Sequence, residues 1–150
     1  MANWETVFEY KDGHLYWLSS RGNAKAGSKA GSITKDGYWY LQYDKRQIYA
    51  HRVVWEMHNG EIPDGLCVDH INTNKSDNRL CNLRLVTVKE NGYNRNAKGY
   101  CLDKVTNKWK AYIKRDGVVY HLGYFEKESD AALAYAEAKK QYHVIKTEVA

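Results

Sequence analysis

The chain has 150 residues, of which 43% are hydrophobic and 27% are charged, and its formal net charge is +5 at pH 7. A chain of this length can bury one modest core or two small ones, and it contains no apolar run long enough for a signal peptide or a membrane span. Its three cysteines include no Cys-x-x-Cys pair, which argues against a disulfide framework. We therefore expect a cytoplasmic protein with reduced cysteines and no membrane contact.

Residues 1–60 have the pattern of a β-rich region that ends in a helix. Residues 51–58 predict that helix, with His51 and Trp55 on the same side. A helix-face histidine beside a tryptophan is more often a packing residue or a phosphate contact, so we leave His51 out of the predicted chemistry. Four short apolar runs between turn signals predict strands: residues 7–10, 14–18, 31–34 and 38–43.

The most informative residues are Asp69 and His70, which follow an apolar run over 66–68. A second run over 83–86 comes directly after Asn82, and the polar residues between the two runs predict a long loop that joins two strands. The first strand then ends in a carboxylate and an imidazole, and the second starts at an amide. This combination is what a one-metal site for phosphodiester cleavage requires.

Thr87-Val88-Lys89-Glu90 is a capping box, so we expect a helix to start at Thr87. Asn91 would lie in the second turn of that helix, on a surface that can lean back over the hairpin. Strand, loop, strand and helix would then bring four polar side chains together in a ββα-metal arrangement. Two alternatives stay open, because Asn91-Gly92 could terminate the helix and Asn-rich loops are usually only turns.

The segments Val68-Asp69-His70-Ile71-Asn72 and Lys75-Ser76-Asp77-Asn78-Arg79-Leu80-Cys81-Asn82-Leu83, followed by Asn91, resemble the HNH endonuclease family. The resemblance is closest to the phage-borne homing endonucleases. It implies that His70 is the general base and that Asn82 ties the loop to the hairpin and so orients His70. An imidazole suits the role of base because its ordinary pKa lies near neutrality.

The same resemblance implies that Asp69 and Asn91 hold one divalent cation, with Asn in the last position, where the family more often has His. One carboxylate and one amide oxygen are hard ligands, which favours Mg²⁺ or Mn²⁺ over zinc. A site with one metal ion cuts one strand per visit, so we expect a nick in double-stranded DNA from a monomeric enzyme.

The C-terminal third alternates with a period of two residues, with Trp109, Ala111 and Ile113 on the apolar side. Asp116-Gly117 is a hairpin signal, residues 118–125 supply the returning strand, and residues 128–142 predict an alanine-rich helix. Residues 89–124 hold eight Lys and Arg against three Asp and Glu, a local net charge of +5. The side chains that we expect to contact DNA are Arg95, Lys98, Lys104, Lys108, Lys110, Tyr112, Lys114 and His121.

Lys98-Gly99-Tyr100, Leu122-Gly123-Tyr124-Phe125 and Asp130-Ala131-Ala132-Leu133 resemble the APETALA-type DNA-binding domain of plant ethylene-response factors, versions of which also occur fused to HNH nucleases. The resemblance implies that the outer sheet face docks on DNA. The residues at the base-reading positions differ from those of that family, so no target sequence follows. The alternative for a lysine-rich strand face is an ordinary solvated surface.

The sequence thus predicts an α+β protein with a β-rich N-terminal region, a central ββα-metal motif, and a C-terminal three-stranded antiparallel sheet packed on one helix. We expect an HNH endonuclease domain over 1–96, with the β-rich part over 1–60 and the motif over 66–96, and an APETALA-like domain over 97–150. The enzyme would act in the host cell if a phage encodes it. Two alternatives are a DNA-binding regulator with a non-cleaving HNH fold and a weakly specific nuclease.

Overall fold

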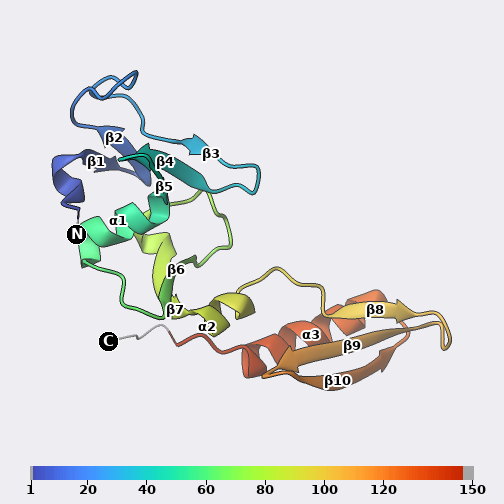
Figure 1. Cartoon of the computed structure of the whole chain (residues 1–150). Coiled ribbons are helices and arrows are strands. Elements are labelled where there is room, and N and C mark those ends of the chain that lie inside the picture. Colours follow the sequence, from blue (N-terminus) through green and yellow to red (C-terminus); the bar gives the residue numbers. More distant parts are fainter. Residues whose placement is uncertain (1, 147–150) are drawn as a thin grey trace. The chain divides into compact units, whose positions relative to one another are not determined.

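The computed structural model describes residues 2–146, which form two compact units, one up to Val88 and one over Lys89–Lys146 (Figure 1). Small antiparallel sheets and a few helices build both units, which confirms the predicted α+β class. In the part of the chain that the structure describes, no helix is long and apolar enough to cross a membrane.

The first unit begins with a 3-10 turn, η1, and two small sheets. Strands β1 and β2 form a hairpin, and β3, β4 and β5 form a three-stranded sheet in that order. The prediction missed β5, because the turn before it, Asp44-Lys45, has two positive φ angles (49° and 62°) without the glycine that usually signals such a turn. The bounds are Trp4–Thr6 for η1, Phe8–Lys11 for β1, His14–Trp17 for β2, Ser32–Ile33 for β3, Trp39–Tyr43 for β4 and Arg46–Tyr49 for β5.

Helix α1 (Ala50–Asn59) covers the core of this unit with Val53 and Val54, both fully buried. The strands contribute further side chains that are almost completely buried, including Phe8, Leu15 and Leu41. Burial of such apolar side chains is the main stabilising contribution to a fold of this size. The α1 helix is thereby fixed, and with it the position of His51 at the second residue of the helix.

Strands β6 (Leu66–His70) and β7 (Leu83–Thr87) form an antiparallel ribbon in which Asp69 faces Arg84 and His70 faces Leu83. A short 3-10 turn, η2 (Leu80–Asn82), leads into β7. Consecutive side chains of a strand point to opposite faces. Asp69 and His70 therefore flank the end of β6 from two sides.

The β1–β2 hairpin braces the loop between β6 and η2. Tyr10 Oη accepts a hydrogen bond from the backbone N–H of Leu80 at 3.1 Å. Gly13, with φ +84°, lies so close to this loop that a Cβ there would be 2.9 Å from the backbone nitrogen of Arg79. The N-terminal hairpin thus fixes the backbone on which Asn78 and Arg79 stand.

We expect Gly13→Ala to destabilise the protein more than Gly27→Ala. Both glycines have positive φ, where a Cβ costs about 1–2 kcal/mol, but open space surrounds Gly27, whereas Gly13 meets backbone. Urea unfolding should place Gly13→Ala at least about 1 kcal/mol below Gly27→Ala, because the loop backbone must move. Equal stabilities would mean that the hairpin does not support the loop.

The second unit contains α2 from Lys89 onward (the helix spans Val88–Tyr93), a sheet of order β10-β9-β8, and α3. Helix α3 packs on all three strands, and Ala111, Ile113, Ala131 and Ala138 are buried between helix and sheet. This arrangement confirms the predicted three-stranded antiparallel sheet packed on one helix. The bounds are Tyr100–Asp103 for β8, Lys108–Arg115 for β9, Val118–Phe125 for β10 and Glu128–Tyr142 for α3.

Candidate active site

His70, the last residue of β6, is 5% exposed, and its Nε2 lies 2.8 Å from Oδ1 of Asn78. An amide oxygen can only accept a hydrogen bond, so with the Asn78 amide in this orientation Nε2 carries the hydrogen and donates it. In the neutral ring, Nδ1 is then the nitrogen with the lone pair. This hydrogen bond selects the tautomer that a general base acting through Nδ1 needs.

Asn78 is a site residue that the sequence analysis missed. It is 1% exposed, and its side chain holds His70 across a separation of eight residues. The only sequence signal was a polar residue inside an Asn-rich loop, where asparagine is normally a turn former. Its role becomes visible only when the loop is folded against the N-terminal hairpin.

We expect Asn78→Ala to lower the cleavage rate about tenfold or more, whereas Asn78→Asp, which keeps an acceptor oxygen, should retain most of it. The alanine variant leaves the buried Nε2–H of His70 without its acceptor, which also costs about 1–3 kcal/mol of stability. Single-turnover cleavage and urea unfolding of both variants check this. Equal rates for Asn78→Ala and the wild type would show that Asn78 does not orient the base.

Asn82 ties the loop to the start of β7 through both ends of its amide. Its Oδ1 accepts from the backbone N–H of Asn72 at 3.0 Å, and its Nδ2 donates to Asn72 Oδ1 and to the carbonyl of Asp77 at 3.0 and 2.8 Å. Asp77 in turn binds the Arg79 guanidinium, which holds the pKa of this carboxyl far below its usual range. These bonds fix the loop that carries Asn78.

Asp69 lies on the other face of the ribbon, 7% exposed, and its Oδ2 accepts two hydrogen bonds from Arg84 at 2.9 and 3.0 Å. The pair follows from the register, because residues that face each other in an antiparallel ribbon bring their side chains together. The sequence analysis did not anticipate Arg84. Asn91 lies on α2 in the second unit.

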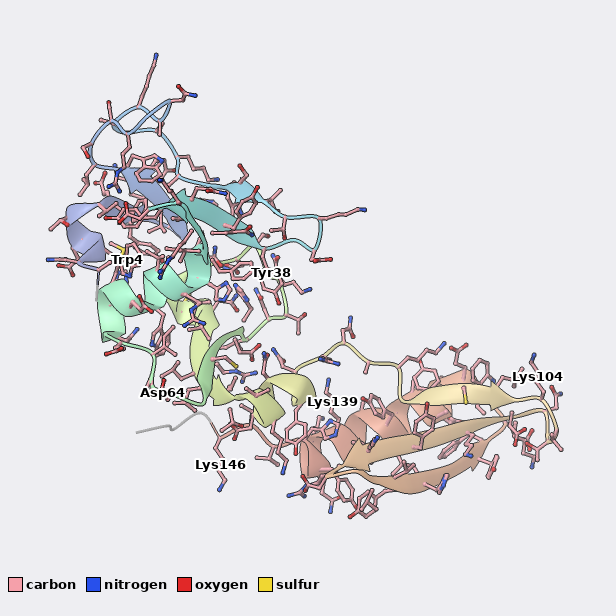
Figure 2. All side chains as sticks on the ribbon, viewed as in Figure 1. Trp4, Tyr38, Asp64, Lys104, Lys139 and Lys146 are labelled. Carbon is pink, nitrogen blue, oxygen red and sulfur yellow. The ribbon has the colours of Figure 1, made fainter. Side chains whose placement is uncertain are left out.

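His51 belongs to the same neighbourhood as His70. The two ring centroids lie 5.0 Å apart with planes at 69°, and Tyr38, labelled in Figure 2, has its ring 5.7 Å from His51 and 6.1 Å from His70. Burial, reinforced by repulsion from His70 and Arg52, lowers the pKa of His51 to about 3. His51 is therefore neutral at physiological pH.

We expect His51 to make the protein acid-sensitive. Below pH 6.5 the unfolded chain takes up a proton at this side chain, whereas the folded chain does so only near pH 3. The unfolded state thus binds more protons across this window, and stability falls as the pH falls. Between pH 8 and pH 5 His51 should account for about 2 kcal/mol of lost stability, which urea unfolding of the wild type and His51→Phe can measure. A His51→Phe variant with the same acid sensitivity would contradict this.

The candidate DNA contacts all lie in the second unit. Tyr112, His121 and the lysines at 110 and 114 belong to paired strands, with Tyr112 facing His121 and Lys114 facing Val119. Lys98 and Lys108 form ion pairs with Glu128 and Glu126 at 2.9 and 2.8 Å. Arg95 follows α2, and Figure 2 shows Lys104 at the tip of the β8–β9 hairpin.

Comparison with known proteins identifies the segment around this site. The family model of the HNH endonucleases matches residues 48–93, from β5 through α1, β6 and β7 to the end of α2. Residues 48–93 are therefore similar to the HNH endonucleases. His51, Asp69, His70, Asn78 and Asn82 all lie within this matched segment.

Several known proteins are similar to the chain. An uncharacterized HNH endonuclease of Acanthamoeba polyphaga mimivirus is 33% identical over 69% of this chain and 57% of its own length. Protein 3.8 of Escherichia phage T7 is 36% identical over 45% of this chain and 62% of its own. The chain thus spans about three fifths of each of these relatives. A solved structure of the HNH homing endonuclease I-HmuI has a TM-score of 0.45 and 27% identity, covering 77% of this chain and 71% of that one.

HNH endonucleases generally use a divalent metal ion. Within residues 2–146, no three His, Cys, Asp or Glu side chains gather into a metal-holding group. In the first unit, Asp69 offers a carboxylate next to His70. A carboxylate oxygen is a hard ligand, of the kind that suits a cation such as Mg²⁺ or Mn²⁺.

Proposed function

We propose that the protein is a metal-dependent DNA endonuclease of the homing type that hydrolyses a phosphodiester bond and nicks one strand. The observation that carries this proposal is the hydrogen bond from His70 Nε2 to the buried Asn78 Oδ1, within the segment that matches the HNH endonucleases. This buried amide selects the tautomer of His70 with hydrogen on Nε2 and a lone pair on Nδ1. Such a selection has an evident use in proton transfer. A protein that only bound DNA would have no such use for it.

In the proposed reaction, His70 takes a proton on Nδ1 from a water molecule. The water oxygen bonds to phosphorus as the bond from phosphorus to the leaving 3′-oxygen breaks. A positioned general base typically accelerates such a step about 10²- to 10⁴-fold. Asn78 holds the ring in the required tautomer, and Asn82 holds the loop on which Asn78 stands.

Asp69 and Asn91 would hold the divalent cation, Mg²⁺ or Mn²⁺. When bound there, it supplies Lewis-acid stabilisation of charge on the phosphate and on the leaving oxygen. Arg84 donates two hydrogen bonds to Oδ2 of Asp69 and so fixes the rotamer of this side chain. A phosphodiester lying across the end of β6 would then meet Asp69 from one side and His70 from the other.

In this proposal the two parts of the chain have different roles. Residues 1–96 cleave DNA, and the APETALA-like residues 97–150 recognise it. The HNH match ends at residue 93, so the second role rests on the sequence pattern and on the sheet itself. Lys114 on β9 and His121 on the adjacent β10 are exposed, and Lys110 and Tyr112 on β9 are half-buried. Lysines and aromatic rings on one sheet face suit a DNA groove. The enzyme would work as a monomer, and in the host cell if a phage encodes it.

Metal binding tests this proposal at the residue level. The electron paramagnetic resonance signal of free Mn²⁺ should fall when wild-type protein and duplex DNA are added, and plasmid cleavage should require Mg²⁺ or Mn²⁺ and stop in EDTA. Asp69→Asn should weaken both effects, whereas Asp64→Asn, which alters an exposed carboxylate before β6, should change neither. Cleavage that persists in EDTA would overturn the metal-dependent mechanism.

A further inference from the structure

Contacts on the ring of His70, as well as its hydrogen bond, set the orientation of the imidazole. The bond from Nε2 to Asn78 Oδ1 acts on one atom of the ring, and the torsion that orients a histidine ring has broad minima, so ring contacts influence its plane. A general base must point its lone pair at the attacking water, and a misplacement of about 1 Å can cost about 10²-fold in rate. The side chains that pack against the ring therefore contribute to the position of its lone pair.

His51 is one of the side chains that pack against this ring. Its ring lies 5.0 Å from the His70 ring with the planes at 69°, an edge-to-face arrangement typical of aromatic pairs. Tyr49 stacks on His51 at 5.6 Å and 24°, and Tyr38 contacts both histidines. Val53 and Val54 anchor α1 in the core, and His51 itself is 8% exposed, so packing restrains the His51 ring.

The charge state of His51 suits this contact. Burial lowers the pKa of His51 to about 3, so this side chain is neutral at physiological pH. When His70 takes a proton, it becomes the only positively charged ring of the pair. The neutral His51 ring does not repel this charge. A lysine or arginine at this position would oppose that charge.

We propose that His51 is a positioning residue: its neutral ring fixes the plane of the His70 imidazole, while Asn78 fixes the tautomer. This inference rests on the proposed function, in which His70 is the base. The feature that matters is the flat, uncharged ring, so phenylalanine should serve in its place and alanine should not. We expect the DNA affinity to stay unchanged when His51 is replaced, because its side chain is 8% exposed and offers little surface to DNA.

The test compares His51→Ala and His51→Phe in the full chain. Single-turnover cleavage at saturating protein should be about 10- to 100-fold slower for His51→Ala and within about threefold of wild type for His51→Phe, while the Kd for DNA stays within twofold for both. Thermal unfolding confirms that each variant is folded. A wild-type rate for His51→Ala, or loss of cleavage in a folded His51→Phe, would overturn the inference.

A readout without cleavage separates this inference from the proposed function. Nitrogen-15 NMR of the histidine rings at pH 8 should show His70 as the Nε2–H tautomer with a single sharp pair of signals in the wild type and in His51→Phe. In His51→Ala the same signals should broaden or double as the ring moves. Sharp, unchanged His70 signals in His51→Ala would refute the positioning role. If the wild type is inactive but His51→Ala shows these NMR changes, the proposed nuclease function is refuted and the positioning role of His51 is not.

Discussion

His70→Ala should lower the rate of DNA cleavage by about 10²- to 10⁴-fold, the usual contribution of a positioned general base, and leave DNA affinity within about twofold. His70 is 5% exposed and bonded to Asn78, so its removal takes away proton transfer and little contact surface. Single-turnover cleavage and gel-shift titration on the same plasmid fragment measure the two effects separately.

His70→Gln is the matched variant for this experiment. Its amide can donate to Asn78 as Nε2 does, and so it fills the site without supplying a base. It should be as inactive as His70→Ala but closer to wild type in stability, because the buried acceptor keeps its partner. Loss of DNA binding together with cleavage in both variants would show that His70 is structural. Full activity of His70→Gln would remove it from proton transfer.

Replacing Lys110, Tyr112 and Lys114 together with alanine should weaken DNA binding at least about tenfold. Charge-assisted hydrogen bonds are worth about 1.5–3 kcal/mol each, and about 1.4 kcal/mol corresponds to a factor of ten. Two fewer phosphate contacts should also reduce the slope of log Kd against log salt by about 1.8. Titrations at several salt concentrations, on duplex DNA of fixed length, measure both quantities.

The control removes the same charge from another part of the second unit. Lys127 and Lys140 are exposed at the start of α3 and near its end, and the double alanine variant lowers the net charge by the same two units. If binding depends on the sheet face, the control should keep nearly wild-type affinity and salt slope. An equal loss of DNA affinity in both variants would show that the sheet face contributes only through the net charge of the protein.

The features that the sequence predicted well depend on local patterns. The β6–β7 ribbon follows from two apolar runs, and the alternation over Lys108–Arg115 correctly assigned Ala111 and Ile113 to the buried face. The alanine-rich pattern of α3 predicted the helix over Glu128–Tyr142 and its small contact residues. Side-chain periodicity alone determines which face of such an element is buried.

The features that it missed arise from contacts between distant segments. Asn78 reaches His70 because Tyr10 and Gly13 brace the loop from more than sixty residues upstream. His51 looked like a packing residue of α1 and is one, but the surface it packs against includes His70. Composition and spacing indicate that a polar residue is present and do not reveal which distant side chain it meets.

The most direct test of the central claim is the time course of supercoiled plasmid conversion by the wild-type chain in Mg²⁺, with EDTA and His70→Ala in parallel. DNA from the source genome should be included, since a homing-type enzyme recognises few sites. We expect open circles that accumulate only with the wild type in Mg²⁺, because the proposed enzyme is a monomer whose one active site cuts one strand. No cleavage of either DNA while binding is retained, or equal cleavage by His70→Ala, would contradict the account.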